Sequence, residues 1–213
     1  MNPTSQQIRS YTNDGFLLLS GLVERKTVER ARQALLRHVS HVHSNTYHAF
    51  VSDSAVLACF NKDICSTASQ LAGVRKRFAP PATVYTISVF PTAEEWKWPA
   101  AHIDHAREED AHQTFPPPFT IGCLIYLTDI QPHCGGTVVW PGSHLRLEAR
   151  AAAEPERYRH LSSLNRDIEK FDLGDPIEIT AQSGDVLFYH YLCAHAGSGN
   201  TGTEPRLALN HKW

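Results

Sequence analysis

The chain has 213 residues, 42% of them hydrophobic and 20% charged, with a formal net charge of −2 at pH 7. These values favour one globular domain, residues 1–213, and argue against long disorder and against the broad basic face that binds nucleic acid. The polar N-terminus is unlike a signal peptide, no stretch is long enough to span a membrane, and five scattered cysteines indicate no disulfide framework, so we expect a cytoplasmic protein.

The first part of the chain, residues 1–80, is predicted to be a helical layer. From 24 to 42, apolar residues recur at three- and four-residue steps, which predicts a helix with an apolar stripe. A second helical stretch, in one piece or two, is predicted over 54–71, and Gly73 is suited to end it. The HVSHVH run at 38–43 lies near the end of the first helix, where we expect a solvated face.

After Pro81 the pattern changes to short apolar runs separated by Gly, Pro, Asn and Asp, which predicts strands and turns. The predicted strands cover 83–90, 120–130, 135–140, 176–180, 185–191 and 206–213. Many short strands with turns between them favour a sandwich or barrel over a parallel sheet with alternating helices. We therefore expect a mainly β fold in which residues 81–213 form the barrel.

One segment interrupts these strands. Residues 144–170 contain helix formers and charges without a strong apolar period. We expect this segment to lie outside the barrel as a solvated surface insertion. A lid over a pocket is the alternative.

The first candidate site is the sequence HIDH at 102–105. In an extended segment, residues two apart project to the same side, so His102 and Asp104 can converge on one point while Ile103 turns into the core. A further histidine would complete one face of the coordination of a divalent metal. A chain with 13 histidines and 22 acidic residues is expected to contain about one His-x-Asp by chance. From this motif alone, a polar loop is the better interpretation.

The second candidate site lies near the C-terminus, where His195 ends an apolar run and Arg206 opens the last one. Two antiparallel strands joined by the loop between them would place these two residues side by side. A guanidinium at the mouth of an apolar barrel needs an anionic partner, which a bound dicarboxylate would supply. His190 is expected on the same strand as His195 but on its opposite face, which excludes it from the same metal site.

These segments resemble the phytanoyl-CoA dioxygenase family of iron(II)- and 2-oxoglutarate-dependent oxygenases. The segments that carry the resemblance are HID at 102–104, CGGTVVWPGSH at 134–144 and the stretch 195–206. The opening at 10–35 is also similar to the start of that family, where a Gly-Phe strand precedes a helix. The resemblance implies a double-stranded β-helix, a cupin-like jelly roll, with the N-terminal helices packed on the outside of the larger sheet.

The resemblance also implies roles for single residues. His102, Asp104 and His195 would bind iron(II), and Arg206 would pair with the far carboxylate of 2-oxoglutarate. Members of the family use O2 to convert this cosubstrate to succinate and CO2 while oxidising a second substrate, most often by hydroxylation. Three protein ligands leave room for the keto acid and for oxygen, so His105 is expected beside the site or at the surface, with a substrate contact as the alternative.

Some residues depart from the family pattern or leave it open. Several members have a serine or threonine two residues after the distal histidine, whereas this chain has Gly197. Tyr85 and Thr137 could reach the cosubstrate from neighbouring strands, although such residues more often belong to a core. Trp96 and Trp98 precede the metal motif and are candidate substrate contacts, with packing under a loop as the alternative.

The leading functional hypothesis is an oxygenase that acts on a small molecule. A non-catalytic cupin-like sensor is one alternative, and a zinc hydrolase with a metal-bound water is another. The zinc hydrolase leaves Arg206 unexplained. Balanced charge makes a compact natural product or amino-acid derivative a slightly better primary substrate than a CoA thioester, and no short motif specifies it further.

Overall fold

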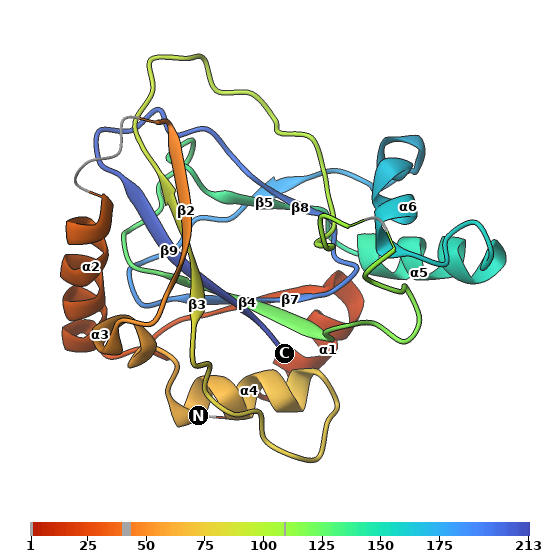
Figure 1. Cartoon of the computed structure of the whole chain (residues 1–213), viewed down its shortest axis with the longest axis horizontal. Helices are drawn as coiled ribbons and strands as arrows, with labels where there is room; N and C mark the ends of the chain where they lie inside the picture. Colours follow the sequence, from red (N-terminus) through yellow and green to blue (C-terminus); the bar gives the residue numbers. More distant parts are fainter. Residues whose placement is uncertain (1, 40–43, 109) are drawn as a thin grey trace.

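The computed structural model describes residues 2–39, 44–108 and 110–213, and two antiparallel sheets dominate it (Figure 1). The larger sheet has the order β1-β7-β4-β9-β3-β2 and the smaller one β6-β5-β8. The strands are β1 (Phe16–Leu19), β2 (Thr46–Val51), β3 (Val84–Val89), β4 (Ile121–Tyr126), β5 (Thr137–Val139), β6 (Ile177–Glu178), β7 (Val186–His190), β8 (His195–Gly197) and β9 (Arg206–Lys212). This arrangement confirms the predicted mainly β jelly roll, and each predicted strand is present.

Helices cover the outer face of the larger sheet. They are α1 (Ser5–Asp14), α2 (Arg25–Val39), α3 (Ser54–Leu57) and α4 (Lys62–Leu71). The apolar stripe of α2 is buried, as predicted, in one cluster with outward-facing side chains of β4 and β7. The second predicted helical stretch forms two pieces, because Asn61 caps α4 by accepting hydrogen bonds from Asp63 N and Ile64 N. Among the described residues, no helix has the length and apolar character that crossing a membrane requires.

Residues 1–80 are not helical alone, because β1 and β2 join the larger sheet. β1 corresponds to the Gly-Phe strand that the family resemblance implies. β2 was not predicted, since it is an edge strand whose side chains alternate between exposed and half-buried without a strongly apolar face. The part of the HVSHVH prediction at 40–43, and the end of the first predicted helix, lie outside the described residues.

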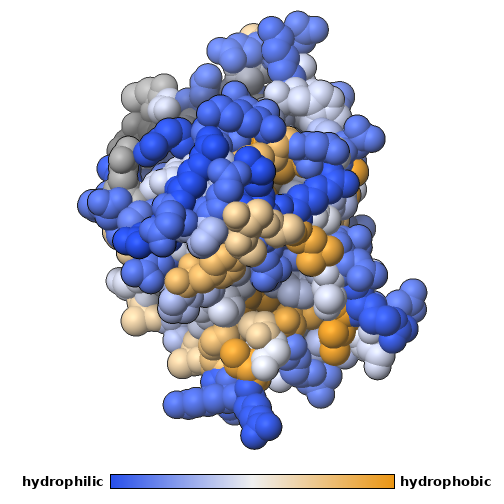
Figure 2. Space-filling view, turned by 90° about the vertical axis from the view of Figure 1, so that its right-hand side faces the viewer, coloured by the Kyte–Doolittle hydropathy of each residue, from blue (hydrophilic) through white to orange (hydrophobic). Residues whose placement is uncertain are grey.

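The segment 144–170 lies outside the sheets, as expected, but the prediction of a merely solvated insertion was wrong. It forms α5 (Ser143–Ala153), α6 (Leu161–Arg166) and the short 3₁₀ helix η1 (Ile168–Lys170). Leu147, Leu161 and Leu164 are fully buried in a second apolar cluster. The face of the molecule on this side is mostly hydrophilic, with hydrophobic side chains gathered across its middle and lower part (Figure 2). The insertion is therefore a packed layer with a largely polar outer surface.

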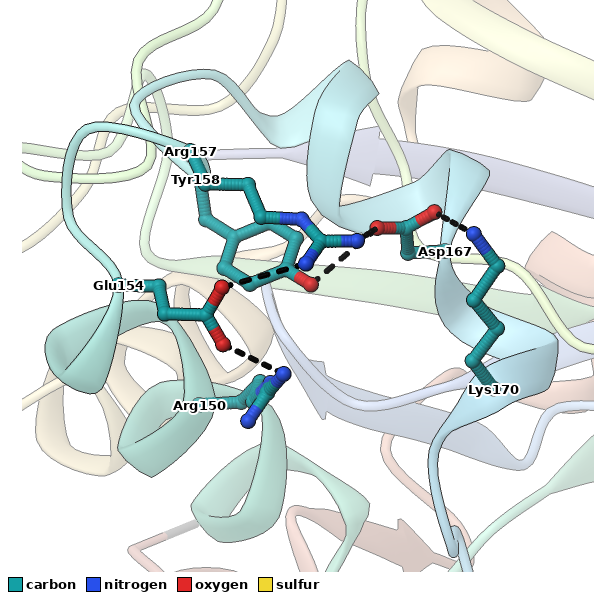
Figure 3. A network of polar contacts seen from close by, with 6 residues as sticks. All are labelled: Arg150, Glu154, Arg157, Tyr158, Asp167 and Lys170. Carbon is teal, nitrogen blue, oxygen red and sulfur yellow. Dashed lines mark hydrogen bonds and ion pairs between the residues drawn. The ribbon is translucent and has the colours of Figure 1, made fainter.

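A network of ion pairs holds the two helices of the insertion together (Figure 3). Asp167, which follows α6, accepts from Arg157 at 2.5 Å, from Lys170 at 2.6 Å and from the Tyr158 hydroxyl at 3.2 Å. Glu154 at the end of α5 lies 3.2 Å from the same Arg157. Arg157 therefore bridges a carboxylate at the end of each helix.

Replacing Asp167 with Asn is expected to destabilise the protein at neutral pH and less so in acid. Hydrogen bonds from Lys170 and Arg157 hold the pKa of Asp167 at about 2, below its ordinary value of 3.8. A depressed pKa contributes stability above pH 4 that is lost as the pH falls towards 2. Urea unfolding of both proteins between pH 6 and pH 2 should give a difference that is constant above pH 4 and then shrinks. Glu156→Gln, which breaks an exposed pair with Arg159, is the control and should change stability little.

Candidate functional site

Three candidate metal ligands meet between the two sheets. His102 and His195 form an isolated antiparallel bridge, in which each backbone N–H donates to the other's carbonyl oxygen at 2.9 Å. The ligand atoms of His102, Asp104 and His195 all lie within 4.8 Å of one another. Ile103, which lies between His102 and Asp104 in the sequence, is fully buried, because successive side chains of an extended segment point to opposite sides. The backbone bridge therefore places the distal histidine beside the HID motif.

The protonation states of these side chains suit a divalent cation. His195 Nδ1 lies 2.9 Å from the carbonyl oxygen of Cys193, and this contact orients the ring so that Nε2 is the nitrogen on the side of Asp104. Burial and the neighbouring His195 lower the pKa of His102 to about 4. Burial alone would raise the pKa of Asp104, but His195 and Lys212 outweigh it and lower the pKa to about 2. Neutral imidazoles and an ionised carboxylate are the forms that bind metal.

Side chains of the larger sheet orient Asp104. Lys212 Nζ lies 2.9 Å from its Oδ1, and the Tyr189 hydroxyl donates to its Oδ2 at 3.1 Å. Asn210 Nδ2 in turn donates to the Tyr189 oxygen at 2.7 Å. Tyr189, Asn210 and Lys212 were not predicted from the sequence. The signal available for two of them is that Asn210 and Lys212 fall on alternate positions of β9 with Arg206 and therefore share one face.

Gly122 gives Tyr189 the room to reach Asp104. It lies between Tyr189 of β7 and Lys212 of β9 in the register of the sheet. A Cβ atom at Gly122 would lie 2.3 Å from Tyr189 Cζ, closer than any van der Waals contact. The absence of a side chain here lets the phenol ring cross β4.

Replacing Gly122 with Ala is expected to displace the Tyr189 ring and to cost about 1–3 kcal/mol of unfolding free energy, as overpacking of a core does. The hydrogen bond to Asp104 is lost with the ring, so metal affinity should also fall. Adding Tyr189→Ala removes the clash, and the double variant should be no less stable than Tyr189→Ala alone. Additive losses in this double-mutant cycle would show that the two residues do not collide.

The insertion contacts the metal motif through Asn165 of α6. Its Oδ1 accepts from the backbone N–H of Ile103 at 2.8 Å, between the two proposed ligands. Its Nδ2 lies 3.2 Å from His105 Nε2. The backbone also pairs nearby, since Gln113 and His160 form a β-bridge. The layer that sequence analysis regarded as a solvated insertion therefore supports the segment that carries His102 and Asp104.

Replacing Asn165 with Ala is expected to lower metal affinity by about tenfold, the lower end of the range for changes outside the ligands themselves. The reason is that the Ile103 N–H loses its acceptor and the segment that positions the ligands loosens. Titration with Co(II) measures the affinity. Asn165→Asp retains the acceptor oxygen and should bind Co(II) nearly as well as the wild type, whereas equal losses in both variants would contradict this explanation.

Arg206 lies inside the same cavity as the three candidate ligands. The cavity has a volume of about 290 Å³ and is lined by residues of both sheets. Arg206 is 3% exposed, donates to Thr137 Oγ1 at 3.1 Å and lies 5.5 Å from the centre of the Tyr126 ring. Burial lowers its pKa, and its Nε has no hydrogen-bond partner within the described structure. A buried guanidinium without a carboxylate partner fits an anionic ligand.

Gly197 offers no hydroxyl, but the neighbouring strand β5 has one close to Arg206. Thr137 lies directly opposite Gly197 in the pairing of β5 with β8. Its oxygen accepts from both Arg206 and the Tyr126 hydroxyl, at 3.1 and 3.0 Å. A hydroxyl has two acceptor sites and one proton, so the proton of Thr137 is left to donate into the cavity. The sequence indicated Thr137 as a residue that could reach the cosubstrate, although such residues more often belong to a core.

The two strand relationships predicted for His195 were wrong. His195 and Arg206 are not neighbours in a hairpin, since β8 pairs with β5 in the smaller sheet and β9 belongs to the larger one. They face one cavity from opposite sheets. His190 likewise lies on β7 rather than on the strand of His195, and its ring lies 5.1 Å from that of His144. It lies outside the cavity lining, as expected.

The motif 134–144 holds the strand of the distal histidine. Val139 pairs with His195, and Gly135 N donates to the carbonyl oxygen of Gly199 at 3.0 Å. At the other end, Ser143 Oγ accepts from Ala194 N at 2.9 Å. The glycine-rich motif therefore positions His195.

The three candidate substrate contacts do not line the cavity. The Trp96 ring stacks on His133 at 4.2 Å and meets the Trp98 ring edge-on at 4.8 Å. His105 is exposed beside Asn165. For Trp96 and Trp98 the geometry favours packing in the loop, and a role of the three residues in substrate binding stays a prediction.

Comparisons with known proteins agree with this geometry. The family model described as phytanoyl-CoA dioxygenase (PhyH) matches residues 40–208. No curated protein sequence matches the chain. The solved structure of SnoK, a non-heme alpha-ketoglutarate-dependent carbocyclase from nogalamycin biosynthesis, is similar with a TM-score of 0.72 and 19% identity, over 98% of this chain and 82% of SnoK.

Two further solved structures share the fold. HygX from Streptomyces hygroscopicus, with nickel and 2-oxoglutarate bound, has a TM-score of 0.61 at 18% identity, over 99% of this chain and 87% of HygX. EctD from S. alaskensis, with bound Fe, has a TM-score of 0.63 at 16% identity, over 98% of this chain and 75% of EctD. The family model spans most of the sequence, and the chain therefore belongs to the phytanoyl-CoA dioxygenase family.

Proposed function

We propose that this protein is an iron(II)- and 2-oxoglutarate-dependent oxygenase that oxidises a small molecule, and that residues 1–213 form a single domain of this kind. The observation that carries the proposal is the buried guanidinium of Arg206, which shares one cavity with the His-Asp-His cluster and has no carboxylate partner within the described structure. A metal cluster alone is compatible with many functions. The added anion site fits a dicarboxylate that also reaches the metal.

The residues divide into two binding groups. His102, Asp104 and His195 would hold iron(II), and their donor set of two imidazoles and one carboxylate is typical of non-heme iron oxygenases. Arg206 and Thr137 would bind the far carboxylate of 2-oxoglutarate. When bound, iron(II) with O2 and 2-oxoglutarate supplies an oxidation that releases succinate and CO2.

The remaining contacts keep these groups in place. Lys212 and Tyr189 hold Asp104 in one orientation, and the carbonyl oxygen of Cys193 holds the His195 ring. Leu124, Val139 and Leu187 give the cavity apolar walls that limit the entry of water. A zinc hydrolase or a sensor could use the same cluster, but a hydrolase would leave the buried guanidinium without an anion.

The test separates these functions by a spectrum and a product. Purified protein is mixed anaerobically with iron(II) and 2-oxoglutarate, and the weak visible charge-transfer band of the chelate is recorded. Oxygen is then admitted and succinate is measured, since family members form some succinate even without their primary substrate. We expect both signals. A protein that binds zinc but gives neither band nor succinate would overturn the proposal in favour of a hydrolase or sensor.

A further inference from the structure

Each charged side chain that lines the cavity in the described chain is paired or assigned to the cosubstrate, so none remains to pair with a charged group of the primary substrate. Among its lining residues in the described chain, three have charged side chains: Asp104, Arg206 and Lys212. Lys212 Nζ is paired with Asp104 at 2.9 Å, and Arg206 is assigned to the cosubstrate. The other lining residues are uncharged or are histidines. An ionised group of the substrate would therefore enter this space without a counter-ion, which is costly.

One wall of the cavity is built from aromatic rings on β2 and β3. His48 and Tyr85 line the cavity, and their ring centres lie 5.5 Å apart with planes 32° apart. Phe50 lies opposite Tyr85 in the register and its ring centre is 5.0 Å from that of Tyr85. Since His48 and Phe50 are two residues apart on one strand, they share a face. We call His48, Phe50 and Tyr85 the aromatic wall.

The aromatic wall is uncharged near neutral pH and extends beyond the enclosed space. Partial burial, and to a lesser extent the nearby Arg206, lower the pKa of His48, so its ring is neutral at pH 7. Phe50 is 75% exposed, the largest value among the large hydrophobic side chains that the structure describes. The wall therefore continues from the cavity to the surface of the edge strand β2.

The size of the cavity indicates that the substrate uses this outer part. A volume of about 290 Å³ lies just below the ~300–1,000 Å³ that small-molecule sites occupy. Bound 2-oxoglutarate would take a large share of it. Most of the primary substrate must then lie outside this cavity. Phe50 does not line the cavity, but its exposed ring lies 5.0 Å from that of Tyr85, which does.

We propose that the primary substrate presents an uncharged aromatic or conjugated ring to the aromatic wall, with polar groups limited to hydroxyl or carbonyl oxygens. This inference rests on the function proposed above. Tilted rings about 5 Å apart provide the offset and edge-on contacts that another ring prefers. The Tyr85 hydroxyl and the His48 ring can exchange hydrogen bonds with a hydroxyl or carbonyl group. A charged group of the substrate that enters the enclosed cavity would be left unpaired there.

The experiment compares two naphthalene probes that differ in charge, together with a charged thioester. The protein is loaded anaerobically with iron(II) and saturating 2-oxoglutarate, and the chelate band is recorded first. Equilibrium dialysis then measures binding of 2-naphthol, 2-naphthoate and acetyl-CoA. The variants are Phe50→Ala, which removes the ring, and Phe50→Leu, which retains apolar bulk without a ring. Phe115→Ala is the control, because Phe115 is also exposed (44%) but belongs neither to the cavity lining nor to the aromatic wall.

We expect 2-naphthol to bind the loaded protein at least about tenfold more tightly than 2-naphthoate or acetyl-CoA, because the charges of the latter two find no counter-ion in the cavity. Both Phe50 variants should lose about tenfold, whereas Phe115→Ala should bind as the wild type does. No preference for 2-naphthol, no binding of it, or equal losses in Phe50→Ala and Phe115→Ala would overturn the aromatic wall as the substrate site. Absence of the chelate band would instead contradict the proposed function itself.

Discussion

Replacing Asp104 with Asn is expected to weaken iron(II) binding by more than ~100-fold, beyond the ~10–100-fold that changes around metal ligands cause. The amide has nearly the same shape and can still accept from Tyr189, so the fold should be retained. The lost negative charge leaves Lys212 and Arg206 as the charged side chains of the cavity among the described residues, and these cations repel a divalent ion. Anaerobic titration with iron(II), with circular dichroism as the test of folding, measures the effect.

The control for this variant is Asp110→Asn. Its side chain is 87% exposed and lies 3.3 Å from His160, away from the cavity lining. It should bind iron(II) as tightly as the wild type. If Asp104→Asn kept its iron affinity, the cluster of His102, Asp104 and His195 would not be the metal site, and the proposed function would be contradicted.

The sequence predicts the candidate metal ligands but not the side chains that contact them. The reason is that these contacts depend on which residues of neighbouring strands lie opposite each other. His102, Asp104, His195 and Arg206 stand in short motifs that a reader can recognise in isolation. Tyr189 and Lys212 reach Asp104 because both are registered against Gly122, on two different neighbours of β4. No local pattern in one strand states which residue of another strand lies opposite. For the same reason, the position of Thr137 opposite Gly197 could not be predicted.

The sequence also does not show which strands belong to the same sheet. His190 and His195 are five residues apart, yet they lie on β7 and β8 in different sheets. The run that contains them is apolar almost throughout, so it reads as one strand, and only the backbone turn at residues 191 and 192 divides it. The insertion was misjudged for a related reason. Its buried residues Leu147, Leu161 and Leu164 follow helical steps, but the break between α5 and α6 interrupts the period.

Replacing Arg206 with Met is expected to weaken 2-oxoglutarate binding by about 2–5 kcal/mol, roughly 30-fold or more, while iron(II) binding changes little. The guanidinium is buried and has no carboxylate partner within the described structure, whereas the thioether keeps apolar volume without charge. Arg206→Lys should restore binding only in part, because an ammonium cannot form the planar pair of hydrogen bonds. Titration followed through the chelate band measures both affinities.

The stability of the ligand-free variant decides whether Arg206 serves folding or binding. Nε of Arg206 has no partner within the described structure, so apolar Met at this buried position should leave the free energy of unfolding unchanged or raise it. Thr137→Val should weaken 2-oxoglutarate by about 1.5–3 kcal/mol, the worth of one hydrogen bond to a charged group. A residue required for folding would behave in the opposite way: Arg206→Met would unfold at lower urea concentration, and iron and 2-oxoglutarate would be lost together. Arg206 is a binding residue if the variant stays folded, keeps its iron affinity and loses only the keto acid.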